Sequence, residues 1–128
     1  MLFGNQPFIA DMTAQAVSHP SPVAPGMARR FQTRAQMIHA RLDGVAGLRV
    51  HSPEAGMFTL IDVSAVSGSG SAFAHALLEE AGVAVMPGSS FGAALGGWVR
   101  VGLTQPDAVI VEACERIAAF AARPMVTA

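Results

Sequence analysis

One five-residue segment matches the glycine-x-serine-x-glycine pattern of hydrolase nucleophiles. It runs from Gly88 through Ser90 to Gly92, and in hydrolases the pattern exposes a serine hydroxyl on a tight strand-to-helix turn for acyl transfer. That chemistry also needs an acid and then a histidine later in the chain, and no histidine follows His75. The next segment, 93–97, is too rich in glycine for the required helix. The pattern therefore does not favour a serine hydrolase.

Arg100 has the chemistry of a ligand-binding residue. It is the only charged residue between Gly82 and Asp107, and it lies in an apolar stretch typical of a strand. Alternation along that strand puts it on the face shared by Trp98 and Gly102. A planar guanidinium holds a carboxylate by two charge-assisted hydrogen bonds, and a glycine neighbour leaves room for a ligand. An edge-strand arginine in water fits the same pattern, so both roles stay open.

The other polar residues give weaker signals. The segment Gly68–Gly70 resembles a phosphate-binding loop, but the rest of the dinucleotide-binding pattern is absent, so a plain loop is favoured. Glu79 and Glu80 are adjacent, so their side chains point apart, and both are expected in solvent. The histidines lie in different elements without the spacing of a metal site: His19, His39, His51 and His75. No metal site is predicted.

The composition indicates one domain with a concealed surface. The 128 residues are 52% apolar before 13 glycines are added, and only 13% are charged, against about 25% in an average soluble domain. Such a chain either spans a membrane or hides much of its exterior. No stretch approaches the roughly 18 uninterrupted apolar residues of a spanning helix. We therefore expect burial against another protein and no membrane partner.

Charge and cysteine content bear on partners and location. The net charge is -1 and the eight basic residues are scattered arginines, so nucleic acid is not an expected partner. The one cysteine, Cys114, falls in the apolar pattern of a helix and is expected to be a small core residue. Residues 1–8 lack the basic start and long apolar run of a signal peptide. A cytoplasmic location is expected.

Apolar periodicity predicts alternating helices and strands. A short helix over 8–18 ends at the following prolines, and the longest helix runs from Met27 to Leu42. Faces other than the apolar one carry its arginines: Arg29, Arg30, Arg34 and Arg41. The later elements are strands over 48–50 and 57–63, which form a plausible antiparallel pair, a helix over 72–81, strands over 83–86 and 98–103, and a final helix.

The connections and the final helix complete the predicted fold. Segment Ser64–Ser71 is expected to be a flexible loop, and Thr104 with Asp107 resembles a helix-capping arrangement, with Pro106 in the first turn. The expected buried stripe of the last helix is Val109, Ile110, Ala113, Ile117 and Phe120. The fold class is α+β: a small two-layer sandwich with helices on one face of a largely antiparallel sheet, preceded by a long connecting helix. The opposite face has no helix left to cover it.

Three segments together carry a resemblance to a known family. They are Pro53–Phe58, Leu77–Gly92 and Trp98–Val101, and their order and spacing resemble the small domain of class I/II (fold type I) pyridoxal-phosphate-dependent aminotransferases. In that family the arginine of the last strand binds the α-carboxylate of the amino-acid substrate, and Arg100 stands at its place. Phe58 resembles the family's strand residues near the substrate, although burial in the small-domain core explains it equally well.

The resemblance also covers the N-terminal part of the chain. Residues 1–26 are similar to the end of the family's large domain, and residues 27–128 to its C-terminal small domain with the connecting helix. In the family, residues near this N-terminal segment approach the cofactor of the neighbouring subunit. The resemblance therefore implies a homodimer, and it makes Gly4 and Asn5 candidate cofactor contacts.

The absence of lysine limits what the chain can do. The family's lysine bonds to pyridoxal 5′-phosphate and carries the proton, a role that needs an amine, and the sequence contains none. We therefore expect part of an enzyme that transfers an amino group between an amino acid and a 2-oxo acid, inactive and without cofactor on its own. The alternative is a stand-alone amino-acid-binding or dimerisation module. Related lyases and acyl-transferases share the fold.

Overall fold

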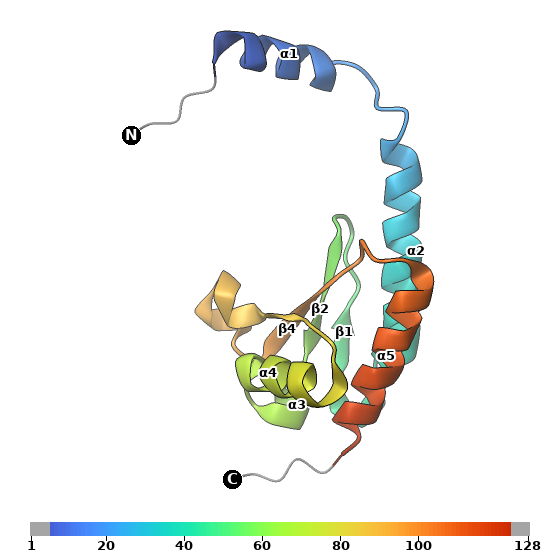
Figure 1. The fold of residues 1–128 in the computed structure, drawn as a ribbon, viewed down its shortest axis with the longest axis vertical. Helices are drawn as coiled ribbons and strands as arrows, with labels where there is room; N and C mark the ends of the chain where they lie inside the picture. Colours follow the sequence, from blue (N-terminus) through green and yellow to red (C-terminus); the bar gives the residue numbers. More distant parts are fainter. Residues whose placement is uncertain (1–5, 124–128) are drawn as a thin grey trace.

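The computed structural model describes residues 6–123 as a helical arm joined to an α+β sandwich (Figure 1). The helices are α1 (Pro7–Val17), α2 (Ala24–Leu42), α3 (Ser64–Ser67), α4 (Gly70–Ala81) and α5 (Asp107–Ala121), with 3₁₀ turns η1 (Val45–Gly47), η2 (Gly88–Phe91) and η3 (Ala93–Leu95). The strands are β1 (Arg49–His51), β2 (Phe58–Asp62), β3 (Met86–Pro87) and β4 (Trp98–Gly102). This architecture confirms the predicted fold class.

The four strands form one antiparallel sheet in the order β1-β2-β4-β3. The predicted antiparallel pair is β1 with β2. In the pairing across the sheet, His51 lies opposite Leu60, Leu60 opposite Arg100, and Arg100 opposite Met86. Because side chains alternate along each strand, these four residues share one face. That open face carries Arg100 toward the middle of the sheet.

The opposite face of the sheet is buried under helices. Val50, Ile61 and Val99 belong to the same core cluster as apolar residues of α2, α4 and α5. Between α4 and α5 the rings of Phe73 and Phe120 meet edge to face, with centroids 5.3 Å apart, an arrangement that aromatic quadrupoles favour. One face of the sheet is therefore packed, and no helix within residues 6–123 covers the other, as the sequence predicted.

The long helix differs from its prediction at two points. It begins at Ala24, three residues before Met27, with Pro25 in its first turn, where a missing N–H costs no hydrogen bond. Met27 itself is 46% exposed and does not belong to the core. Arg34 does not lie on an outer face but is buried at 9% exposure. Its guanidinium donates to Asp107 and to the carbonyl of Leu103, and these partners make its burial tolerable.

The predicted loop over residues 64–71 is wrong. Most of it is helical, as α3 and the first turn of α4. The backbone N–H of Ser64 donates to a carboxylate oxygen of Asp62 at 2.9 Å, and the hydroxyl of Ser69 accepts from the N–H of Ala72 at 3.3 Å. Both bonds satisfy backbone amides at the start of a helix. The prediction of a loop rested on the serine and glycine content of the segment, which does not reveal such capping bonds.

Three further predictions near the sheet edge need correction. The strand over 83–86 is reduced to Met86–Pro87, because the N–H of Val83 is used at the end of α4, bonding to Leu77. Asp107 forms an ion pair instead of a side-chain cap, and the N-cap of α5 is Pro106. Val109 is 46% exposed, so it does not belong to the buried stripe.

Candidate functional site

Arg100 lies between two aromatic rings on the open face of the sheet. Its guanidinium carbon is 5.1 Å from the ring centroid of Phe58 and 4.2 Å from that of Phe91. Both distances are within the range of cation-π attraction, which is stronger where water is partly excluded. The two rings hold the guanidinium plane in place. A phenylalanine ring has no oxygen or nitrogen atom that accepts a hydrogen bond, so neither ring occupies the N–H donors of the guanidinium, and these remain available to a ligand.

A groove of about 590 Å³ lies in front of this cluster. Its lining residues come from the turn before β2, from the approach to β3, and from β4: Gly56, Met57, Phe58, Ala84, Val85, Met86, Arg100, Gly102 and Thr104. Arg100 is the only charged residue among them. An anion entering the groove therefore meets a single fixed cation with apolar walls, and the electrostatic attraction is less screened there than in open water.

None of the ion pairs within residues 6–123 involves Arg100. Arg34, Arg49, Arg116 and Arg123 each pair with a carboxylate, whereas the described contacts of the Arg100 guanidinium are with rings. A half-buried cation with aromatic neighbours and free donors is suited to a carboxylate that comes from outside the chain.

Phe91 is the site residue that sequence reasoning missed. It ends the 3₁₀ turn η2, whose first residue, Gly88, is buried with no room for a side chain. A Cβ at Gly88 would lie 2.4 Å from the carbonyl oxygen of Leu95 and 2.7 Å from that of Trp98. The turn is therefore seated closely on the start of β4. The phenylalanine-glycine pair was visible in the sequence, but only the contact with Arg100 assigns it a place.

The structure separates the other sequence candidates from this site. Ser90 lies exposed in the 3₁₀ turn η2 and not at the start of a helix, which removes the hydrolase geometry. Gly4 and Asn5 lie outside the described residues. Across residues 6–123, no group of three metal-binding side chains is assembled, and no helix there is long and apolar enough to cross a bilayer.

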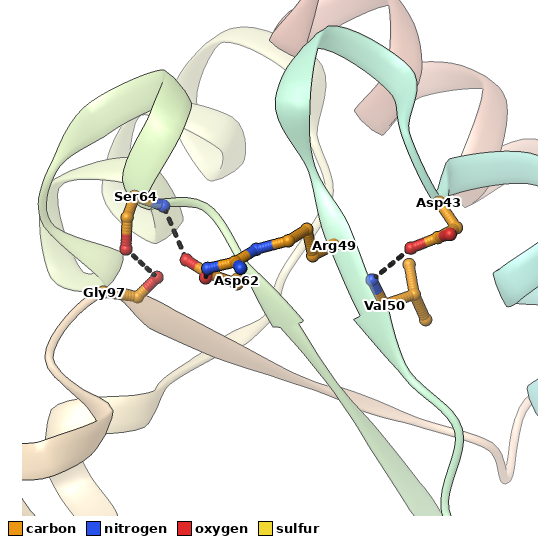
Figure 2. Close-up of polar contacts among 6 residues, drawn as sticks. All are labelled: Asp43, Arg49, Val50, Asp62, Ser64 and Gly97. Carbon is orange, nitrogen blue, oxygen red and sulfur yellow. Dashed lines mark hydrogen bonds and ion pairs between the residues drawn. The ribbon is translucent and has the colours of Figure 1, made fainter.

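Asp62 is the last residue of β2, and its side chain links the start of α3 to the neighbouring strand β1 (Figure 2). Its carboxylate is 4% exposed, pairs with Arg49 on β1 and accepts from the backbone N–H of Ser64. Burial alone raises the pKa of this carboxyl, but hydrogen bonding to Ser64 and the charge of Arg49 outweigh it and hold the pKa below its ordinary value. The hydroxyl of Ser64 reaches the carbonyl of Gly97, two residues before Val99 of β4.

Asp62 predicts how stability responds to acid. A lowered folded-state pKa contributes stability that is present above the unfolded value of 3.8 and is lost as the pH falls through the folded value. Asp62→Asn should cost about 1 kcal/mol at pH 7 and flatten the fall in unfolding free energy below pH 4. Urea unfolding from pH 7 down to pH 2 measures this. If the unfolding free energy of Asp62→Asn fell below pH 4 as steeply as that of the wild type, Asp62 would not be the cause of the acid dependence.

Comparison with known proteins gives the family of the chain. A model of the family described as aminotransferase class I and II matches residues 2–117. The solved aspartate aminotransferase from Rhizobium meliloti superposes with a TM-score of 0.75 at 30% identity, over 84% of this chain and 29% of that one. This chain belongs to the class I and II aminotransferase family.

Two curated relatives fix the scale of the match. The chain is 36% identical over 122 residues to the arginine–pyruvate transaminase of Pseudomonas aeruginosa, covering 95% of this chain and 31% of that protein. It is 37% identical over 111 residues to the aspartate aminotransferase of Bacillus sp. strain YM-2, covering 83% of this chain and 28% of that protein. The chain therefore spans less than a third of the length of these relatives.

The family implies pyridoxal 5′-phosphate in the full-length enzyme. Enzymes of this kind hold that cofactor through a lysine amine, and the basic residues of this sequence are eight arginines and no lysine. A guanidinium stays protonated and does not replace the amine. The residues present therefore do not fit the cofactor by themselves.

Proposed function

We propose that this chain is the C-terminal part of an aminotransferase and supplies the arginine that binds the substrate carboxylate. The reaction is the transfer of an amino group between an amino acid and a 2-oxo acid. The observation that carries the proposal is the placement of Arg100 at a groove between Phe58 and Phe91, where its guanidinium forms no ion pair with any residue that the structure describes. Both substrates of transamination carry a carboxylate next to the reacting carbon, so one cation serves both half-reactions.

The geometry of the groove supports a carboxylate as the ligand. A guanidinium binds a carboxylate through two parallel hydrogen bonds, which fixes the direction of the bound molecule as well as its position. The apolar side chains of Met57 and Met86 line the groove together with Arg100, so they offer a ligand apolar contact beside those donors. A structurally similar aspartate aminotransferase from Thermus thermophilus was solved with maleate, which is a dicarboxylate.

The proposed enzyme also needs a large domain with the cofactor lysine, and this sequence contains no lysine. A large domain carrying the lysine would cover the open face of the sheet, and residues 1–26 would belong to it. The helix α1 has no buried residue, and Phe8, Ile9 and Met12 on it are all exposed, which favours packing against another domain or a second copy. We propose a cytoplasmic homodimer in which Gly4 and Asn5 contact the cofactor of the neighbouring subunit.

Pairing the chain with a lysine-bearing large domain tests this proposal. We expect the chain alone to be inactive with any amino acid and 2-oxo acid, and the pair, called the assembled enzyme below, to transfer amino groups when pyridoxal 5′-phosphate is added. A coupled assay for the new amino acid measures this. Carboxylate binding by the chain with no activity in the correctly folded pair would instead favour a non-catalytic binding module.

The aromatic contact of Arg100 gives a prediction on substrate binding. Phe91→Ala should raise the KM for the amino acid by about two- to fivefold, because a half-exposed cation-π contact is worth about 0.5–1 kcal/mol. Phe91→Tyr is the matched control, since it keeps the ring and should leave KM near the wild-type value. Steady-state kinetics of the assembled enzyme separates the two variants. Equal effects of alanine and tyrosine would contradict a role for the ring.

A further inference from the structure

A partly buried ion pair joins the long helix α2 to the segment that follows the strand carrying Arg100. The Nε of Arg34 donates to a carboxylate oxygen of Asp107 at 2.6 Å, and its Nη1 donates to the carbonyl oxygen of Leu103 at 2.9 Å. The Arg34 side chain is 11% exposed and the Asp107 side chain 60%. One guanidinium thus reaches across from α2 to both ends of the connection between β4 and α5.

Leu103 is held on both sides of its peptide. Its N–H donates to the carbonyl of Met57 at 2.8 Å, and its carbonyl accepts from Arg34. Met57 precedes Phe58, which pairs with Gly102 in the sheet. The bond from Arg34 therefore fixes the end of the β2–β4 ladder, and Arg100 stands three residues back along β4, about 10 Å away at the rise of a strand.

The position of α2 is connected to the position of β4 through Arg34. In Figure 1 α2 lies beside α5 and continues past the start of that helix toward α1. Arg34 is the first buried residue along α2. It marks the level at which the helix enters the packed layer. A carbonyl left without this donor would be a buried unsatisfied acceptor, which costs more than a weakened bond between exposed groups.

We propose that Arg34 is a positioning residue that fixes the place of the Arg100 guanidinium by tying α2 to the end of β4. The inference rests on the proposed function, because it assigns Arg34 to the same carboxylate site. Arg34 touches no substrate. It acts through Leu103 and the ladder, and Asp107 holds its guanidinium from the other side. A movement of α2 relative to the sheet would then also move β4 and the Arg100 guanidinium that it carries.

The test uses Arg34→Gln, with Arg41→Gln as matched control. Arg41 lies on the same helix but is exposed and bonds only within it, to the carbonyl of Met37 at 3.3 Å. In the assembled enzyme we expect Arg34→Gln to raise the KM for the amino acid by about tenfold, with little change in kcat per folded molecule. Asp107→Asn, at an exposed position, should move KM in the same direction by a smaller factor. Arg41→Gln should leave both constants unchanged.

A second readout detects the position of Arg100 directly. The rings of Phe58 and Phe91 shift the NMR signal of the Arg100 Hε proton, so movement of the guanidinium changes that shift. We expect a change in Arg34→Gln and Asp107→Asn and none in Arg41→Gln. A lowered melting temperature with an unmoved Hε signal and an unchanged KM in both variants would overturn the inference.

Failure of this inference is distinct from failure of the proposed function. If Arg100→Ala raises KM strongly while Arg34→Gln behaves like Arg41→Gln, only the positioning role of Arg34 is wrong. If Arg100→Ala itself leaves substrate binding unchanged, the carboxylate site is wrong and the role of Arg34 in it is overturned as well.

Discussion

Replacing Arg100 by alanine should lower kcat/KM of the assembled enzyme by about 100- to 1,000-fold. The truncation removes both hydrogen bonds to the substrate carboxylate and leaves that anion in an apolar groove without a counter-charge. Losing one partner of a desolvated charge pair costs about 2–5 kcal/mol, and 1.4 kcal/mol corresponds to a factor of ten. Steady-state kinetics across a series of amino acids measures the loss, which should be similar for all of them because they share the α-carboxylate.

Arg100→Lys is the control for charge without the planar fork. A lysine restores the positive charge but offers a single point of contact and stacks less well between two rings. We expect it to recover only part of the lost activity. Full recovery would mean that charge alone matters. An Arg100→Ala enzyme with wild-type kcat/KM would show that the substrate carboxylate binds elsewhere.

The second large effect concerns the glycine at the start of α4. A Cβ at Gly70 would stand 2.2 Å from the backbone oxygen of Trp98 and 3.1 Å from that of Gly96. Backbone atoms cannot swing aside as the tip of a side chain does, so Gly70→Ala must push α4 away from the start of β4. We expect a loss of about 3 kcal/mol in unfolding free energy, a large part of the stability of a small domain.

Gly26→Ala is the matched control for that substitution. Gly26 also lies in a helix, in the first turn of α2, but nothing stands within 4 Å of a Cβ built there. Alanine should therefore stabilise the chain by about 0.5 kcal/mol through its helix propensity. Urea unfolding of both variants compares them directly. Equal midpoints would contradict the close approach of α4 to β4.

The elements with regular apolar spacing were predictable, because burial itself creates the pattern. The sequence placed α1, α4, β2 and β4 within two residues of their observed bounds and predicted the uncovered face of the sheet. It failed where a polar contact between distant residues decides the structure. Because an arginine on a helix usually meets solvent, the spacing predicts an outer face for Arg34, whereas its actual partners lie 69 and 73 positions away in the sequence.

The candidate site could be predicted in part. Arg100 stood out as an isolated charge in an apolar strand, and Phe58 followed from the family resemblance. Phe91 could not be assigned, because its contact with Arg100 depends on how the glycine-rich turn after β3 folds back over the sheet. That path is set by close backbone approaches at Gly70 and Gly88, which spacing along the sequence does not encode.

The most direct test of the carboxylate site is a crystal structure of the assembled enzyme with a bound 2-oxo acid. We expect the carboxylate of that ligand to accept two hydrogen bonds from the Arg100 guanidinium, each about 2.7–2.9 Å long, with Phe58 and Phe91 on either side of the arginine. A ligand carboxylate bound to another residue, with Arg100 turned to solvent, would contradict the account.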